Sequence, residues 1–415
     1  MNILFLTLVS INSIYSETGI YQDLLREFAR HGHKLCIISP IEKKQGKGTY
    51  LVNEKNAKVL RLQIGNTQKT NVIEKGISTV TLEAKFVAGI KKYFADVKFD
   101  LVLYSTPPIT LVKAIEYVKQ RDGAKTYLLL KDIFPQNAVD LGMLSTTGVK
   151  GLLYKYFRNK EKKLYALSDW IGCMSPANVE YVLQHNPEIK KRDDNQRRNY
   201  GKGIVEVCPN SIEVVDKSVD AETRAEIRKK YGIPLDKKVF VYGGNLGKPQ
   251  GIPFLTKCLE KAKVIEDAFF LIVGDGTEYS LLEKYVNSAN QQNLKLMKRL
   301  PKEDYDTMVA ACDVGMIFLD HRFTIPNFPS RLLSYMQAKL PVLAVTDPNT
   351  DIGKVIVAGG FGWWCESDDP IKFKVKISEI LTIDRTDFGE KAFSTLNNTY
   401  TSCVSYNTIY KRVSS

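Results

Sequence analysis

Short apolar segments alternate with amphipathic segments along most of this chain. Residues 2–9 form a mostly apolar run, residues 20–28 repeat apolar side chains at helical spacing, and residues 34–39 are apolar again. A strand, a helix and a second strand in this order are typical of parallel sheets, which helices cover on both faces. The sequence therefore predicts an α/β fold.

The same strand–helix unit recurs in two series. Further strands are predicted at 100–105, 126–130, 169–173 and 204–207, and then at 238–242, 269–273, 294–298, 314–319 and 341–345. The periodicity lapses over residues 212–221, and the charge-dense segment 189–203 is predicted as a loop. Because 415 residues are two to three times the usual domain size, we expect two doubly wound domains with a hinge between them. Their expected bounds are 1–212 and 213–385, with a helix within 386–415 packing back on the first domain.

The composition excludes several classes of protein. Hydrophobic residues make up 44% and charged residues 25%, which is too apolar for a disordered chain. The longest apolar runs fall short of the roughly 20 residues that span a bilayer, and the amino terminus lacks the basic stretch of a signal peptide. The seven cysteines are scattered without a CxxC pattern, as in a reducing compartment. We therefore expect a cytoplasmic protein.

The positive charge is concentrated in the first half of the chain. Residues 1–215 hold 32 basic against 21 acidic residues, a net charge of +11, whereas the remainder holds 27 against 25, a net charge of +2. Such asymmetry indicates a polyanionic partner, which is a nucleic acid, an anionic membrane surface or a phosphorylated substrate. No RNP, zinc-finger or helix-turn-helix pattern supports nucleic acid.

One segment combines positive charge with aromatic side chains. Residues 150–163 (KGLLYKYFRNKEKK) carry six bases and one acid, Glu161, among leucines, tyrosines and a phenylalanine. This mixture fits the interface of an anionic bilayer. It fits equally an ordinary helix with one solvated face and one face in the core.

Two glycine-rich turns follow strands of the second series. The first, VYGGNLGKPQG, includes Gly244, Asn245, Gly247 and Lys248, and the second begins at Gly274. Glycines let backbone N–H groups approach a phosphate closely at the start of a helix. The alternative reading is a pair of tight turns that need a positive φ.

A basic segment precedes a predicted helix start. Arg322 lies upstream, and Ser330 and Arg331 follow Pro329. A serine cap beside an arginine in the first helical turn suits a diphosphate, although a solvated arginine explains it as well. Acids, not arginines, normally stabilise a helix amino terminus, which favours a functional reading for Arg331.

Candidate residues of the first domain also follow strands. Lys131 and Asp132 end the strand at 126–130, where Asp132 could orient an acceptor hydroxyl, act as a base, or simply cap a turn. Glu17, Thr18 and Gly19 lie in the loop after the first strand. Metal chemistry has little support, since the sequence contains no HExxH pattern.

The whole chain resembles the retaining glycosyltransferases of family 4, which have the two-domain GT-B fold. The resemblance is carried by TGIYQDLLREFARHGHKLCIIS, VCPNSIE, VYGGNLGKPQG, LIVGDGTE, AACDVGMI and SYMQAKLPVLA, in this order. Within that family, KDIFPQNAVDLGM together with PSRLLSYM looks most like transferases of N-acetyl-fucosamine and related sugars in capsule and O-antigen assembly.

The resemblance implies that the second domain binds the sugar nucleotide and the first binds the acceptor. Residues 244–247, Ser330 and Arg331 would then approach the donor diphosphate. The chain departs from the family where many members carry an arginine and a lysine in the glycine turn, since Asn245 and Gln250 occupy those positions.

A second departure concerns two glutamates of the family, which align with Pro326 and Ser334. The second glutamate usually helps to hold the ribose. Thr350 and Asp351 are the candidates for that role in this chain.

The resemblance thus implies a metal-independent, retaining transferase of the hexosyl or N-acetylhexosaminyl type that needs no cofactor. A UDP-sugar, with an N-acetylated deoxyhexosamine as the expected sugar, would be the donor, and a lipid-linked saccharide of surface polysaccharide assembly the acceptor, at the inner face of the cell membrane. Arg331 and Lys248 would stabilise the leaving diphosphate, and Asp132 would position the acceptor. The alternatives are a non-catalytic GT-B subunit that stabilises a partner transferase, which the missing glutamates favour, and a sugar-nucleotide epimerase.

Overall fold

The computed structural model describes residues 1–66, 72–383 and 387–414. The chain forms two compact units. Unit 1 comprises Met1–Glu213 and Ser402–Ser415, and unit 2 comprises Val214–Thr401. The segment that belongs to unit 1 at the carboxyl end is therefore shorter than the expected 386–415, because the helix at Phe388–Thr399 packs in unit 2 against the helix at Arg331–Gln337.

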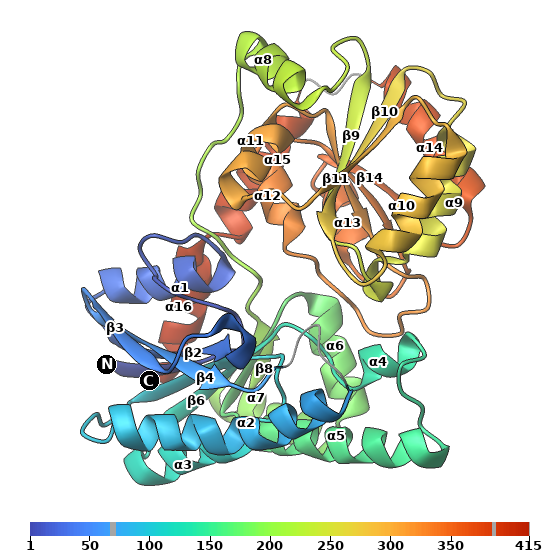
Figure 1. The fold of residues 1–415 in the computed structure, drawn as a ribbon. Coiled ribbons are helices and arrows are strands. Elements are labelled where there is room, and N and C mark those ends of the chain that lie inside the picture. The colour runs from blue at the N-terminus through green and yellow to red at the C-terminus, as the bar shows by residue number, and fades with distance from the viewer. Residues whose placement is uncertain (67–71, 384–386, 415) are drawn as a thin grey trace. The chain divides into compact units, whose positions relative to one another are not determined.

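Unit 1 is built around an eight-stranded sheet in the order β3-β4-β2-β1-β5-β6-β7-β8 (Figure 1). Its strands are β1 Asn2–Leu6, β2 Lys34–Glu42, β3 Tyr50–Glu54, β4 Ala57–Ile64, β5 Leu101–Ser105, β6 Lys125–Leu130, β7 Trp170–Cys173 and β8 Val205–Val207. All neighbours pair in parallel except the hairpin of β3 and β4. Every residue of β5 is buried, as expected for a strand covered on both faces.

Helices cover both faces of this sheet. They are α1 Ile20–Arg30, α2 Val72–Tyr93, α3 Val112–Asp122, α4 Gln136–Asp140, α5 Gly148–Leu167, α6 Pro176–His185, α7 Pro187–Tyr200 and the returning α16 Ser402–Val413, with a short 3-10 turn at Lys43–Gln45. The apolar side chains of α1 that recur at helical spacing, among them Leu25 and Phe28, are fully buried in the core.

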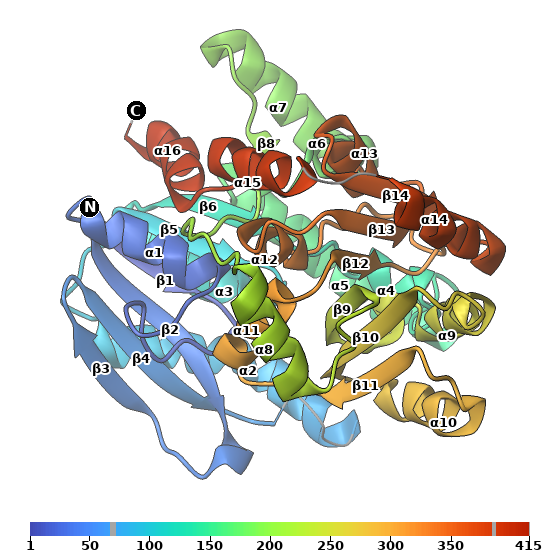
Figure 2. The same ribbon diagram turned by 90° about the horizontal axis from the view of Figure 1, so that it is seen from above.

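Helix α16 lies beside α1 in unit 1 (Figure 2). The ring of Tyr406 meets Phe28 edge-on at 4.8 Å and stacks on His31 at 4.1 Å, and its hydroxyl lies 3.1 Å from Nε2 of His33. Arg412 adds an ion pair with Glu206 at 2.6 Å. The carboxyl-terminal helix is thus part of the core of unit 1.

Unit 2 contains a fully parallel six-stranded sheet in the order β11-β10-β9-β12-β13-β14. The strands are β9 Lys238–Asn245, β10 Ala268–Asp275, β11 Leu294–Lys298, β12 Val314–Phe318, β13 Val342–Thr346 and β14 Gly362–Glu366. The helices are α8 Ala221–Tyr231, α9 Ile252–Ala262, α10 Tyr279–Ala289, α11 Lys302–Ala310, α12 Arg331–Gln337, α13 Ile352–Ala358, α14 Pro370–Thr382 and α15 Phe388–Thr399, with a 3-10 turn at Lys248–Gln250. In Figure 1, α9, α10 and α14 cover one face of this sheet and α11, α12 and α15 the other.

One predicted loop is wrong. The segment 189–203 is mostly helix α7, which Pro187 opens and Gly201, with φ +68°, ends. Its buried Asp193 accepts a hydrogen bond of 2.7 Å from the backbone N–H of Val205, which fixes the polar helix to strand β8. The predicted α/β class with two doubly wound sheets is confirmed, except that the antiparallel hairpin of β3 and β4 at the edge of the first sheet was not predicted. In the part of the chain that the structure describes, none of the helices is long and apolar enough to cross a bilayer.

Candidate functional site

The glycine turn of unit 2 lies at the carboxyl end of β9, which runs on to Asn245. Gly244 has φ +127°, a conformation that side chains rarely adopt. A Cβ at this position would also lie only 3.1 Å from Nη2 of Arg331. Two independent constraints therefore require glycine here, and one of them is the close approach of Arg331.

The guanidinium of Arg331 lies against the turn with unused hydrogen-bonding capacity. Its central carbon is 4.4 Å from the centre of the Tyr242 ring. Its Nη1 atom is buried and has no hydrogen-bond partner among the described residues. Leaving such a donor unsatisfied costs about 1–3 kcal/mol, and more when it is charged, so the atom is suited to receive an anion.

Three tyrosines surround this guanidinium, namely Tyr242, Tyr305 and Tyr335. Burial raises the pKa of Tyr335 to about 12 and also raises the pKa of Tyr242. The Tyr335 hydroxyl donates to the carbonyls of Val241 and Met316 at 3.2 and 3.0 Å. The tyrosines are therefore protonated at neutral pH, and the charge of Arg331 is not neutralised by a phenolate.

Asn245 and Gln250, at the two turn positions where the resembled family carries bases, are hydrogen-bonded to each other. Nδ2 of Asn245 donates to Oε1 of Gln250 at 3.1 Å, and the N–H of Gly247 donates to the same oxygen at 3.3 Å. Lys248, between them, is exposed. Asn245 and Gln250 thus stabilise the shape of the turn and supply no charge to a phosphate.

Arg322 already has an anionic partner. Its Nε and Nη2 atoms donate to the two carboxylate oxygens of Asp320, both at 2.8 Å. The backbone N–H of Asp320 donates to the carbonyl of Pro249 at 3.0 Å, which ties this segment to the glycine turn. Arg322 is therefore close to the predicted phosphate loop, but its charge is largely matched.

Ser330 precedes α12 but does not cap it, contrary to the expected serine cap. Within the described residues its side chain makes no capping hydrogen bond. The reason is that Ser330 itself has helical dihedrals, φ −65° and ψ −16°, whereas a capping residue is extended. Its exposed hydroxyl remains a predicted donor-binding group.

Gly274 and its neighbour Gly276 have a packing reason to be glycines. A Cβ at Gly274 would lie 2.0 Å from the carbonyl oxygen of Gly244, and one at Gly276 would lie 2.2 Å from that of Leu246. These glycines allow the second turn to pack on the first.

The loop with the two ribose candidates is buried. The Thr350 hydroxyl donates to the carbonyl of Asn327, and its N–H donates to Oδ1 of Asp347 at 3.1 Å. Thr350 thus joins its loop to the segment that precedes α12. Asp351 is 9% exposed and precedes α13. Burial of Tyr400 raises the pKa of that tyrosine to about 12, and the charge of Asp351 adds to the rise.

Sequence reasoning missed Glu278, which follows the second glycine turn. Its Oε2 atom is buried without a hydrogen-bond partner in the described part of the chain, and burial raises its pKa. The charges of Lys248, Asp320 and Arg322 act on this carboxyl. Its position just after Gly276, at a strand end, was the signal that could have identified it.

In unit 1, Asp132 is a carboxyl with an altered pKa. Its Oδ1 accepts a hydrogen bond of 2.7 Å from Nδ2 of Asn137, and burial raises its pKa to about 6. Nζ of Lys131 instead donates to the carbonyl of Cys208 at 3.1 Å. Lys131 therefore connects two strand ends, whereas Asp132 is suited to exchange a proton near neutral pH.

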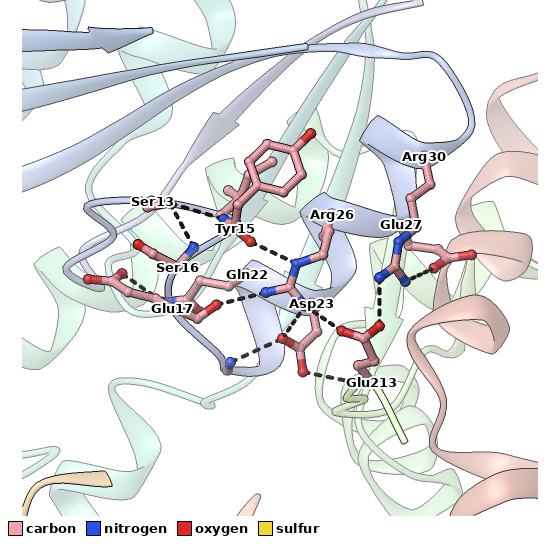
Figure 3. A network of polar contacts seen from close by, with 12 residues as sticks. Ser13, Tyr15, Ser16, Glu17, Gln22, Asp23, Arg26, Glu27, Arg30 and Glu213 are labelled. Carbon is pink, nitrogen blue, oxygen red and sulfur yellow. Dashed lines mark hydrogen bonds and ion pairs between the residues drawn. The ribbon is translucent and has the colours of Figure 1, made fainter. Parts of the chain in front are cut away.

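The loop with Glu17, Thr18 and Gly19 is held by its own polar contacts (Figure 3). The Glu17 carboxylate accepts from Nδ2 of Asn12 at 2.6 Å, and a Cβ at Gly19 would lie 2.7 Å from Oε1 of Gln22. Glu17 thus closes its loop, while Thr18 is exposed.

Arg26, which sequence reasoning did not single out, organises this region. Its buried guanidinium donates to the carbonyls of Ile14 and Glu17 at 2.9 and 2.7 Å. It also binds Asp23 at 3.3 Å and Glu213, the last residue before unit 2, at 2.6 Å (Figure 3). One side chain therefore fixes both the candidate loop and the end of unit 1.

The segment 150–163 lies in α5, whose two faces differ. The exposed apolar side chains Val149, Leu152, Leu153 and Tyr156 follow one stripe at helical spacing, and Lys150, Lys155, Lys162 and Lys163 are exposed as well. The only acid, Glu161, is 3% exposed and pairs with Arg158. Arg158 therefore does not belong to the exposed basic face.

The described residues include no cluster of three or more His, Cys, Asp or Glu side chains that could hold a metal ion. Metal independence and the absence of a cofactor stay predictions.

Residues 223–395, within unit 2, match the model of the family described as "Glycosyl transferases group 1". The chain is 25% identical over 341 residues, 82% of its length and 80% of the relative, to a protein of Pseudomonas aeruginosa named "Probable glycosyltransferase WbjE". It is 26% identical over 263 residues, 62% of its length and 60% of the relative, to the "Putative colanic acid biosynthesis glycosyl transferase WcaI" of Escherichia coli.

Among solved structures, the chain is similar to Anabaena HepE in complex with UDP-glucose. The TM-score is 0.67 at 14% identity, with 100% of this chain and 99% of the other covered. At that identity the likeness shows the fold alone. The chain has the GT-B fold, and residues 223–395 of its second unit match the glycosyltransferase group 1 model.

Proposed function

We propose that the chain is a glycosyltransferase that moves a sugar from a UDP-sugar to a lipid-linked saccharide of surface polysaccharide assembly, with retention at the anomeric carbon. The observation that carries this proposal is the buried, unpartnered Nη1 of Arg331 beside the Gly244 turn. The relatives named glycosyltransferases, one of them in colanic acid biosynthesis, support the reaction class.

In this proposal unit 2 stabilises the leaving group. The bond between the anomeric carbon and the donor phosphate breaks, and negative charge develops on UDP. Arg331 and the exposed Lys248 supply positive charge, whereas the backbone N–H groups of Leu246 and Gly247 already donate to Asp275 and Gln250. Donors fixed in advance toward developing charge are worth a large share of an enzyme's rate enhancement.

The acceptor hydroxyl attacks the same face of the sugar that the phosphate leaves, and its proton passes to an oxygen of that phosphate. Asp132 then acts as a positioning residue for the acceptor. A carboxyl whose pKa is about 6 is mostly ionised at neutral pH and accepts a hydrogen bond from a hydroxyl.

The donor class rests on two supports. The similar HepE structure contains UDP-glucose, and the buried, unpartnered Nη1 of Arg331 suits an anion such as a diphosphate. Within this class we propose an N-acetylated deoxyhexosamine as the sugar, in capsule or O-antigen assembly.

A lipid-linked acceptor requires the protein to reach a membrane surface. The apolar stripe of α5, from Val149 to Tyr156, and the lysines beside it suit the interface of an anionic bilayer. We propose a cytoplasmic protein that attaches reversibly to the inner face of the cell membrane through this helix.

The test is a panel of UDP-, GDP- and TDP-sugars incubated with the full chain and membrane lipids. The proposal expects release of UDP from one UDP-sugar and incorporation of its sugar into the lipid fraction, both reduced in Arg331→Ala. Turnover of none of the donors, together with co-purification of a second transferase, would favour the non-catalytic subunit, the alternative that Pro326 and Ser334 support. A changed sugar nucleotide formed without acceptor would instead identify an epimerase.

A further inference from the structure

A pocket of about 220 Å³ lies inside unit 1, between the helices α4, α5 and α6. The residues that matter for its chemistry are Gln136, Tyr154, Arg158, Glu161, Tyr181 and His185. Its volume is below the roughly 300–1,000 Å³ of pockets for drug-sized ligands, so it has room for about one small ring.

A neutral ion pair forms part of the pocket lining. Glu161 and Arg158 bind each other, and Oε1 of Glu161 also accepts from the hydroxyl of Tyr165 at 2.8 Å. Nη2 of Arg158 donates to the carbonyl of His185 at 2.9 Å and to Oδ1 of Asn186 at 2.8 Å. Because the two charges cancel and the arginine has protein partners, the pocket favours a neutral ligand over an anion.

Another part of the lining is aromatic and offers both a donor and an acceptor. The rings of Tyr181 and His185 stack at 3.9 Å. Nδ1 of His185 lies 2.9 Å from the carbonyl oxygen of Tyr181, and since a carbonyl only accepts, Nδ1 is the donor of this bond. Burial raises the pKa of Tyr181, so its hydroxyl stays a donor.

This combination matches the chemistry of a sugar. A pyranose ring has apolar C–H faces that pack on aromatic rings and hydroxyls that both donate and accept. The pocket supplies tyrosine hydroxyls, the amide of Gln136, the imidazole of His185 and an ion pair without net charge.

Its location fits the acceptor side. The lining residue Ile133 directly follows Asp132, and α5 contributes Tyr154 to the pocket and Tyr156 to the exposed stripe. We infer that this pocket binds one neutral sugar ring of the membrane-anchored acceptor saccharide, an inference that rests on the proposed function. A saccharide whose lipid lies in the bilayer beneath α5 would reach the pocket on the other side of the same helix.

The experiment is saturation-transfer NMR of the full chain with methyl glycosides of neutral hexoses and N-acetylhexosamines at millimolar concentration. Tyr154→Phe removes one hydroxyl from the pocket, and Tyr156→Phe, its matched control, removes one from the outer face of the same helix. A lost hydrogen bond is worth about 0.5–1.5 kcal/mol, so we expect binding to weaken roughly two- to tenfold in the first variant alone. Tyr181→Phe serves as a second pocket variant, and glucose 6-phosphate should bind less well than methyl glucoside.

The inference is overturned if no glycoside binds, or if both pocket variants bind as the wild type does. UDP binding, followed in the same samples by thermal melting, separates the two proposals. UDP binding without glycoside binding removes this inference alone. Glycoside binding that depends on Tyr154, without UDP binding, keeps the sugar pocket and removes the proposed donor.

Discussion

Nη2 of Arg331 lies 3.1 Å from the point that a Cβ on Gly244 would occupy, so the guanidinium packs directly on the glycine turn. Both residues were candidates for the donor diphosphate from their types and positions alone. Their contact is a property of the fold, because 86 residues separate them in the chain. The predictions below begin from this pair.

Replacing Arg331 by alanine should reduce transfer far more than it reduces stability. Loss of a preorganised donor to a leaving group costs about 2–4 kcal/mol in the transition state, a roughly 30- to 1,000-fold loss in kcat/KM. Because Nη1 has no partner in the described structure, the melting temperature without nucleotide should hardly fall. Arg322→Ala is the control, since its guanidinium is paired with Asp320 and its effect on rate should be smaller. Equal rates for the Arg331 variant and the wild type would remove the assignment.

Adding a single methyl group at Gly244 should disturb the contact between Arg331 and the glycine turn without replacing the arginine itself. Gly244→Ala places a side chain at φ +127° and 3.1 Å from Arg331, so the arginine must move. We expect weaker UDP binding in calorimetry. Gly232→Ala is the matched control, since Gly232 also has a positive φ, at +59°, but ends helix α8. Equal UDP affinity in both variants would show that the contact with Arg331 has no role.

Transfer should survive chelation, because the proposed site stabilises the diphosphate with Arg331 and Lys248 in place of a metal ion. The measurement is the rate of UDP release with and without excess EDTA. Loss of the rate with EDTA and its recovery with Mn²⁺ or Mg²⁺ would contradict this account.

Membrane attachment should depend on the exposed lysines of α5 and not on Arg158, which is paired with Glu161 inside unit 1. Replacing Lys155, Lys162 and Lys163 by Gln should reduce co-sedimentation with anionic vesicles, since each base is worth about 1 kcal/mol near such a surface. Binding of the wild type should weaken as salt rises.

The matched control removes the same charge from α7, by replacing the exposed Lys190, Lys191 and Arg198 with Gln. If both triple variants lose vesicle binding to the same extent, the net charge and not helix α5 determines the attachment.

The carboxyl of Asp132 should make the protein less stable as the pH rises. Burial raises its folded-state pKa to about 6 from a model value of 3.8, so the folded state binds the proton more tightly than the unfolded state. Stability contributed by this group is present below about pH 4 and is lost as the pH rises through 6. Asp132→Asn should therefore raise the melting temperature at pH 7.5 more than at pH 4, while it lowers acceptor transfer.

Asp122→Asn is the control with the opposite sign. Burial alone would raise the pKa of Asp122, but hydrogen bonds from Arg121 and the N–H of Phe99 hold it below its usual value. This variant should lose stability at pH 7.5. A melting temperature of Asp132→Asn at or below that of the wild type at pH 7.5 would show that the ionised Asp132 carboxyl does not destabilise the folded protein.

Periodicity predicted the parallel core of both sheets, because strands buried on both faces are recognisable as apolar runs, but it missed the strands β3, β4 and β14 near the sheet edges. It failed for α7, where 189–203 lacks an apolar stripe and was predicted as a loop. Tertiary contacts determine that residues 189–203 are helical, since the hydrogen bond between the buried Asp193 and Val205 attaches a polar helix to the sheet. Pro187 and Gly201 were the local signals for its ends.

The candidate site was predictable only in its residue types. Arg331 and Gly244 were identified from position, but the bond between Asn245 and Gln250 depends on how the turn folds. The expected cap at Ser330 failed because its backbone is already helical. Arg158 is one of the six bases of residues 150–163, and charge patterns do not reveal that it is the one that turns inward to pair with the buried Glu161.

Binding of UDP to the full chain is the measurement that tests the central claim most directly. A ligand that binds only the folded state stabilises it by about 2.7 kcal/mol at a hundred times its Kd. We expect UDP to raise the melting temperature by a few degrees and uridine to raise it less. The difference between them comes from the diphosphate and should shrink in Arg331→Ala. A melting curve that millimolar UDP, GDP and TDP all leave unmoved, or an equal shift with UDP in wild type and Arg331→Ala, would contradict the account.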